Sequence, residues 1–335
     1  MFNKKVLKEF SKAVVTIGLG LVLLTGCGTN KNPEVASAVK SNEKLKIGIV
    51  QLADHQALVE SKKGFEDGIK ELGIDADIEV KSAQGEIAVT NTIASDFVGA
   101  KKDLIYAIAT PSAQAVKNAT KDIPVVFSAV TDAVGAKLVD SNEAPGGNIT
   151  GTVDKAPMEK QIKMFKELNP EAKTIGIIYN TSEENSLVQV KEAKEIAEKL
   201  NLEIEEIGLN TINDVSQAMD SFIGKIQGLY TITDNMIASS ITVITDKANS
   251  ANIPTIGAEI AHVEGGALMS DSISYYELGK QAAKMAERIL VEKENPAEIS
   301  VESAKETKKV LNSETLEKIG LDKNLEIFKD AEIIK

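Results

Sequence analysis

From Leu45 onward, short β-branched runs alternate with amphipathic helical stretches, and this pattern restricts the fold more than any other property of the sequence. Such alternation requires right-handed crossovers and gives parallel sheets with helices on both faces. The first set of predicted strands covers 46–50, 77–80, 104–109 and 123–128, and its helices cover 58–72, 86–101 and 112–119. The second set has strands over 174–179, 203–209, 228–233 and 253–257, and helices over 157–168, 184–200, 213–225 and 236–251. The chain therefore contains two α/β units in tandem.

The C-terminal part adds a short strand over 267–270 and two helices over 275–292 and 313–319. Ser274 and Ser313 stand where the N-caps of these helices are expected. We predict an α/β fold of two doubly wound parallel-sheet lobes joined by a three-crossover hinge. The predicted boundaries are 45–152 plus 258–295 for lobe one, and 153–257 plus 296–335 for lobe two. Open α/β sheets bind ligands beyond the carboxyl ends of their strands, so the cleft between the lobes is the predicted binding site.

The N-terminus resembles a bacterial lipoprotein signal peptide, predicted over 1–26. A lysine-rich start precedes an apolar run over 13–24, which is too short to span a bilayer comfortably. The run ends in Leu24-Thr25-Gly26-Cys27, which resembles a lipobox. The resemblance implies cleavage before Cys27 and acylation of its sulfur, with a flexible tether over 27–44. The fold is then expected at the extracytoplasmic face of the cell membrane, held by lipid alone. An uncut signal anchor is the alternative.

Charge and composition exclude several classes of function. The formal net charge is -12 and Arg288 is the only arginine, so a phosphate backbone would be repelled and nucleic acid is not an expected partner. One cysteine and two histidines give no internal disulfide and no structural metal site. No Gly-x-Gly-x-x-Gly follows a predicted strand, and no Gly-x-Ser-x-Gly elbow occurs. We therefore predict no catalytic residues, no cofactor and no enzymatic activity.

Polar stretches follow the predicted strands and supply the candidate ligand-binding residues. The candidates are His55, Thr110, Ser112, Gln114, Ala129, Thr131, Tyr179, Asn180, Asn185, Asp234, Asn235 and Glu259. Ser112 is expected to N-cap its helix and to direct backbone N–H groups into the cleft. Asp234 is expected to cap a helix or to pair with an ammonium group, and Glu259 is a second carboxylate that could pair with the same group. Tyr179 is expected to stack on a flat ligand or to pack in the core. Hydroxyls, helix N-termini and carboxylates without an arginine describe a site for a zwitterion, that is, an amino acid.

Together these stretches resemble the ABC-transporter substrate-binding proteins of the tryptophan/tyrosine-binding type, a branch of the type I periplasmic-binding-protein fold. The resemblance runs over about 46–293 and rests on 54–58, 110–114, 129–132, 179–180, 184–186 and 233–235. It implies that Ser112, Ala129 and Thr131 hold the ligand's carboxylate and amine from lobe one, with Asp234 as the counter-charge of the amine. It also implies an aromatic L-amino acid as ligand, tyrosine or tryptophan first, a permease and an ATPase as partners, and a monomer.

The first strand-to-helix loop departs from the family's pattern at two positions: Gln56 stands where proline is usual, and Val59 where an acidic residue is usual. The resemblance therefore does not decide which side chain the ligand carries. A binder of a nucleoside or a sugar on the same fold is the main alternative. A surface adhesin, with or without a transport role, is another.

Overall fold

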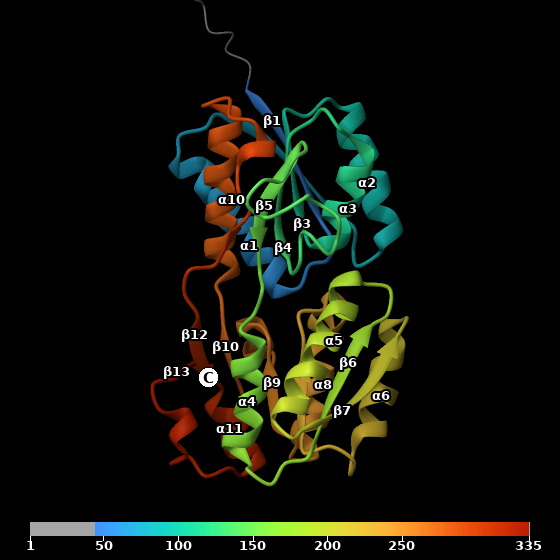
Figure 1. The fold of residues 1–335 in the computed structure, drawn as a ribbon, viewed down its shortest axis with the longest axis vertical. Coiled ribbons are helices and arrows are strands. Elements are labelled where there is room, and N and C mark those ends of the chain that lie inside the picture. The colour runs from blue at the N-terminus through green and yellow to red at the C-terminus, as the bar shows by residue number, and fades with distance from the viewer. Residues whose placement is uncertain (1–43, 335) are drawn as a thin grey trace, which may run out of the picture. The chain divides into compact units, whose positions relative to one another are not determined.

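The computed structural model describes residues 44–334. The predicted signal peptide, Cys27 and all but the last residue of the tether lie outside these described residues. Residues 44–334 form two α/β lobes, each built around its own mainly parallel sheet (Figure 1). The fold class predicted from the alternation of strands and helices is confirmed. Within 44–334, no helix is long and apolar enough to cross a membrane.

Lobe one contains a six-stranded parallel sheet in the order β11-β5-β4-β3-β1-β2. Its strands are β1 (Leu45–Gln51), β2 (Ala76–Ser82), β3 (Leu104–Ile108), β4 (Val125–Val130), β5 (Ile149–Val153) and β11 (Glu302–Ser303). Helices α1 (Gln56–Glu71) and α10 (Tyr275–Leu290) cover one face, and α2 (Ile87–Gly99) and α3 (Thr110–Ala119) cover the other. β3 and β4 are buried along their whole length, as expected for strands covered on both faces.

Lobe two contains a seven-stranded sheet in the order β13-β12-β10-β9-β8-β6-β7, in which only the β10–β12 pair is antiparallel. Its strands are β6 (Thr174–Asn180), β7 (Glu203–Leu209), β8 (Gly228–Thr231), β9 (Thr255–Gly257), β10 (Met269–Ser272), β12 (Lys308–Leu311) and β13 (Glu332–Ile333). One face is covered by α4 (Met158–Leu168) and α5 (Glu184–Lys199), the other by α6 (Val215–Phe222) and α8 (Ile241–Ser250).

Short elements complete both lobes. They are α7 (Asn235–Ser239), α9 (Ile260–Glu264), α11 (Ser313–Ile319), η1 (Ile212–Asp214), η2 (Pro296–Glu298) and η3 (Glu326–Phe328). Two predicted caps have different outcomes. The Ser274 side chain accepts a hydrogen bond at the start of α10, as predicted, whereas α11 is capped by Asn312 and not by Ser313. Asn312 precedes the first helical residue, which is the position from which a side chain can reach the free N–H groups.

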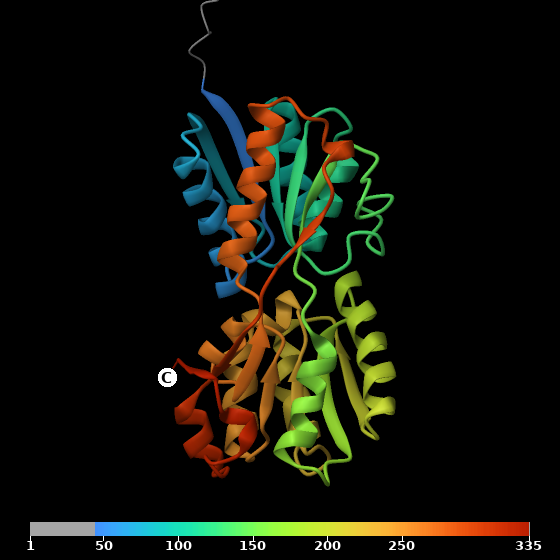
Figure 2. The same ribbon diagram turned by 60° about the vertical axis from the view of Figure 1, so that its left-hand side comes forward.

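The chain passes between the lobes three times: from β5 to α4, from β10 to α10, and from β11 to β12 (Figure 2). The predicted lobe boundaries at Gly257 and Pro296 are wrong. Residues 258–272 stay in lobe two because β10 pairs with β9 and β12. Residues 296–303 stay in lobe one because β11 pairs with β5. The three crossing segments provide the connection about which two lobes can move as rigid bodies.

Candidate functional site

The polar loops at the carboxyl ends of the strands meet at the boundary between the lobes. In the described part of the chain, two side-chain hydrogen bonds cross this boundary directly. His55 Nε2, in the loop after β1, lies 3.1 Å from Asn235 Oδ1 at the start of α7. Gln114 Nε2, on α3, donates to Glu184 Oε2 on α5 at 3.0 Å. These contacts bring four of the predicted loops together and hold the lobes against each other.

The protonation of His55 follows from its neighbours. The Asn235 amide nitrogen donates to Glu183, so the Asn235 carbonyl oxygen is the atom that accepts from His55 Nε2. His55 Nδ1 is then an acceptor, and it is buried without a hydrogen-bond partner among the described residues. Burial lowers the pKa of His55 to about 4, although the Asn235 hydrogen bond opposes this shift. The ring is therefore neutral near pH 7.

Two grooves open along the same boundary. One, of about 520 Å³, is lined by the loop over 53–56, by Gln84 and by segments 238–242 and 261–265 of lobe two. The other, of about 690 Å³, lies between the loop over 84–88 and the strand ends of lobe two. Among the described residues, no lysine or arginine lines either groove, whereas acidic side chains line both: Asp54 and Glu264 in the first, Glu86 and Glu183 in the second. The boundary therefore favours a group that carries positive charge.

Helix α3 begins with a strained residue. Its N-cap is Ala109, with φ 84° and ψ 153°, a backbone conformation that is almost restricted to glycine. The predicted N-cap, Ser112, is wrong because the helix already begins at Thr110, which places Ser112 inside the first turn. Ser112 is fully buried, and its Oγ has no hydrogen-bond partner among residues 44–334. The hydrogen-bonding capacity of this hydroxyl is therefore unused within residues 44–334.

A second strained residue lies beside the first. Ala129 has φ 56° and lies where the pairing of β4 with β5 shifts register. The Ala109 N–H donates to the Ser128 carbonyl at 3.0 Å, which ties the ends of β3 and β4 together. Thr131, just beyond, is buried. Strain of this kind costs about 1–3 kcal/mol per residue and concentrates where a site must be shaped.

Asp234 is the N-cap of α7, one of the two roles predicted for it. Its Oδ1 accepts from the Ile237 N–H at 3.0 Å, and its Oδ2 accepts from the Asn180 N–H at 2.6 Å and from Ser186 Oγ at 2.7 Å. Burial and the neighbouring Glu183 carboxyl raise the pKa of Asp234 to about 7. With three donors in place, the carboxyl joins the strand ends of β6 and β8 to two helices inside lobe two.

Asn180 and Asn185 belong to the same polar network in lobe two. The Asn180 side chain donates to Glu183 at 3.0 Å, and the Asn185 side chain donates to the Thr233 carbonyl at 3.1 Å. Tyr179 lies apart from them. Its ring packs against the core under α4 and α5 and covers Gly208, so the structure gives it the packing role that the sequence also allowed.

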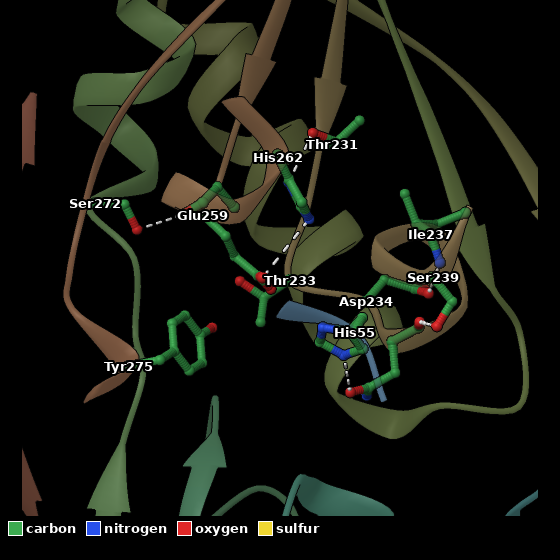
Figure 3. Close-up of polar contacts among 12 residues, drawn as sticks. His55, Thr231, Thr233, Asp234, Ile237, Ser239, Glu259, His262, Ser272 and Tyr275 are labelled. Atoms are coloured by element: carbon green, nitrogen blue, oxygen red, sulfur yellow. Dashed lines mark hydrogen bonds and ion pairs between the residues drawn. The ribbon is translucent and has the colours of Figure 1, made fainter. Parts of the chain in front are cut away.

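A buried acidic cluster at the crossings was largely missed by the sequence analysis. Glu259 was predicted, but Asp154, just after β5, and Tyr275, the first residue of α10, were not. The Tyr275 hydroxyl donates to Asp154 Oδ2 at 2.7 Å. Glu259 Oε2 lies 3.7 Å from Nε2 of His262, and Figure 3 shows these two side chains pointing toward each other. The one feature of the sequence that could have indicated Asp154 is its acidic side chain in a segment that crosses between the lobes.

Electrostatics in this cluster follow from burial. Burial raises the pKa of Glu259 well above its usual range, and the Asp154 carboxyl adds to the shift. Burial also raises the pKa of Asp154, while the hydrogen bond from Tyr275 opposes the change. The pKa of His262 is lowered to about 3 by burial, so this ring is neutral and offers no counter-charge. No group of three or more metal-ligating side chains is placed to hold an ion within the described residues.

Comparison with known proteins gives a consistent result. The family described as ABC transporter substrate binding protein matches residues 46–335. The tyrosine-binding protein of Clostridioides difficile (strain R20291) is 42% identical, over 98% of this chain and 98% of that protein. The ABC domain of Streptococcus pneumonia solved in complex with L-Trp is 34% identical and has a TM-score of 0.82, covering 86% of this chain and 100% of that one.

A third relative bears on the arrangement of the lobes. The ligand-free, open structure of a substrate binding protein with adhesive properties from Clostridium difficile is 41% identical and covers 87% of this chain and 99% of that one. Its TM-score is 0.67, lower than that of the less identical L-Trp complex. As a whole, the present structure is therefore more similar to the L-Trp complex than to the open form, and two hydrogen bonds among its described residues cross between the lobes.

Proposed function

The chain belongs to the family of ABC transporter substrate-binding proteins, and from this premise we propose that it captures an aromatic L-amino acid between its two lobes. The proposal is supported by one relative named for tyrosine and another solved with L-Trp. The observation that carries it is the inter-lobe boundary, where acidic grooves lie beside buried hydroxyl and carboxyl oxygens that have no hydrogen-bond partner within residues 44–334. The role is binding and delivery without turnover, and the partners are a permease and an ATPase that receive the ligand from a monomer.

The ligand's carboxylate is proposed to lie at the start of α3. Ser112 Oγ and the N–H groups of the first helical turn are donors, and a helix N-terminus carries partial positive charge. Three further candidates lie at the carboxyl ends of strands β3 and β4: Thr110, Ala129 and Thr131. Gln114 lies one turn further along α3. A carboxylate can be held there without a guanidinium group.

Closure is proposed to depend on the same contacts that cross the boundary. The His55–Asn235 and Gln114–Glu184 hydrogen bonds join residues of different lobes, so they form only when the lobes meet. A ligand that touches both lobes binds this arrangement more tightly than an open one, and that difference in affinity drives the shift. The permease is then presented with a closed, loaded protein.

Titration calorimetry of the mature chain with the twenty amino acids tests the proposed ligand. We expect saturable binding of L-tyrosine or L-tryptophan and much weaker binding of small amino acids. A ligand at 100 times its dissociation constant stabilises the folded state by about 2.7 kcal/mol, so thermal unfolding gives an independent measurement. Nucleosides and sugars serve as controls. Stabilisation by one of these, with none by any aromatic amino acid, would contradict the proposal.

We also propose that Cys27 carries the lipid that keeps the protein at the extracytoplasmic face of the membrane. This rests on the lipobox-like Leu24-Thr25-Gly26-Cys27 alone. In bacteria fed a labelled fatty acid, the wild-type chain should incorporate label and sediment with membranes, whereas Cys27→Ser should do neither. Labelling of the Cys27→Ser chain at the wild-type level would rule this anchor out.

A further inference from the structure

Two fully buried carboxyl groups come from segments that are far apart in the sequence. Asp154 follows β5 and is 1% exposed, and its N–H donates to the Val130 carbonyl of lobe one at 3.1 Å. Glu259 follows β9 of lobe two and is 2% exposed. Tyr275, which begins α10 after the second crossing, donates its hydroxyl to Asp154 and influences the ionisation of Glu259 as well. These three residues therefore join lobe one, lobe two and a crossing segment in one cluster.

Neither carboxyl group has a cationic partner within residues 44–334. No lysine or arginine among the described residues forms an ion pair with Asp154 or Glu259, and His262, which lies 3.7 Å from Glu259, is neutral. Asp154 Oδ1 and Glu259 Oε2 are both buried and accept no hydrogen bond from the part of the chain that the structure describes. Buried carboxylates are normally paired with a cation or fully hydrogen-bonded, because loss of hydration is otherwise very costly. The cluster thus offers two carboxyl groups to a ligand group that carries donors and positive charge, and the arrival of that positive charge would favour their ionised forms.

An independent observation also points to a ligand. His262 is fully buried, and its Nε2 has no hydrogen-bond partner among the described residues. Thr231 Oγ1 donates to the Ile256 carbonyl at 3.5 Å, so His262 Nδ1 donates to Thr231 Oγ1 at 2.9 Å. In the neutral ring Nε2 is then an acceptor, and it faces Glu259 (Figure 3). An imidazole nitrogen without a hydrogen-bond partner among the described residues therefore faces the Glu259 carboxyl group. Acceptors that converge in this way match an ammonium group, which has three donors and no acceptor.

We propose that Asp154 and Glu259 bind the α-ammonium group of the ligand and make the protein selective for amines, an inference that rests on the proposed function. Asp234, the residue implied by family resemblance, is occupied by three donors of its own lobe and serves as a helix cap. Because the Asp154 backbone is anchored to lobe one and Glu259 belongs to lobe two, an ammonium group held by both also links the lobes. Recognition of the amine and closure of the lobes are then one event.

The test compares each aromatic amino acid with the matched acid that lacks the ammonium group: L-tyrosine with 3-(4-hydroxyphenyl)propanoic acid, and L-tryptophan with indole-3-propanoic acid. Calorimetry is carried out on the mature wild-type chain, Glu259→Gln and Asp154→Asn, with Glu195→Gln on the exposed face of α5 as control. Wild type and control should prefer the amino acid by on the order of 100-fold. Each cluster variant should lose roughly 30-fold or more of its affinity for the amino acid and little for the matched acid.

Each outcome bears on the proposal. A preference ratio that is unchanged in both cluster variants overturns it. Equal wild-type affinities for an amino acid and its matched acid overturn it without any variant, so a variant that fails to fold does not block the test. A wild-type chain that binds neither tyrosine nor tryptophan overturns the proposed function, and this inference with it.

Discussion

Gly279→Val is expected to destroy the packing of lobe one, with a loss of more than about 3 kcal/mol in the free energy of unfolding or failure to fold. Helices α1 and α10 cross at glycines. A Cβ at Gly279 would lie 2.1 Å from the Ser61 carbonyl oxygen and 2.8 Å from the Phe65 backbone nitrogen. These are backbone atoms of α1, so the clash can be relieved only if the helices separate. Overpacking costs about 1–3 kcal/mol even where side chains can adjust.

The position of Ser61 makes such a separation more costly. Its Oγ lies 2.8 Å from the Tyr106 hydroxyl on β3 and donates to Ser128 Oγ on β4 at 3.1 Å. Moving α1 outward would therefore break a buried polar chain that ties the helix to the sheet. Denaturant unfolding measures the loss. Gly99→Ala, at a helical glycine with nothing within 4 Å of the added methyl group, is the matched control and should gain roughly 0.5–1 kcal/mol. Equal unfolding midpoints for wild type and Gly279→Val would refute this account.

Asp234→Ala should produce the second large loss, in lobe two. The change leaves the N–H groups of Asn180 and Ile237 and the hydroxyl of Ser186 without their acceptor. A buried donor left unpaired costs about 1–3 kcal/mol, so we expect a loss of several kcal/mol together with weaker ligand binding. Asp234→Asn keeps one acceptor oxygen and should lose less. An alanine variant as stable as wild type would show that these hydrogen bonds contribute little.

Asp234 also predicts how the stability of the folded chain changes with pH. The pKa of Asp234 is raised to about 7 in the folded chain, so the folded state holds a proton that the unfolded state releases near pH 4. The stability that this proton confers is complete below about pH 4 and is lost as the pH rises to about 7. The lowered pKa values of His55 and His262 act in the opposite direction below pH 6.5. Subtracting the unfolding curves of Asp234→Asn from those of wild type isolates the aspartate, and a flat difference from pH 4 to 8 would contradict the assignment.

Much of the fold could be predicted because it depends on near neighbours in the sequence. The continuous apolar runs of β1 and β3 indicate strands that are covered on both faces. The spacing of the apolar residues in α10 indicates a helix with one buried face, and Ser274 is its N-cap. These properties depend on which residues lie two, three or four positions apart. The same kind of information placed polar residues at the strand ends, including Ser112, Asp234 and Glu259.

Other predictions failed or were missed because they depend on contacts between distant residues. β10 has four residues and β11 has two, so their own sequences do not say which sheet they join, and the lobe boundaries were misplaced. The left-handed conformation of Ala109 is imposed by its neighbours and not by its side chain, which is why the start of α3 was assigned two residues too late.

By itself, then, the sequence determined two lobes of parallel sheet and the polar character of their strand ends, since periodicity and capping are local. Only the tertiary structure decided which polar groups meet. Tyr275 reaches Asp154 across 121 positions of the chain, and their burial comes from the packing of both lobes. Whether a carboxyl group is solvated, or buried without a counter-charge, depends on all the segments that pack around it. Those segments are brought together only when the lobes assemble, so no single stretch of the sequence reveals them.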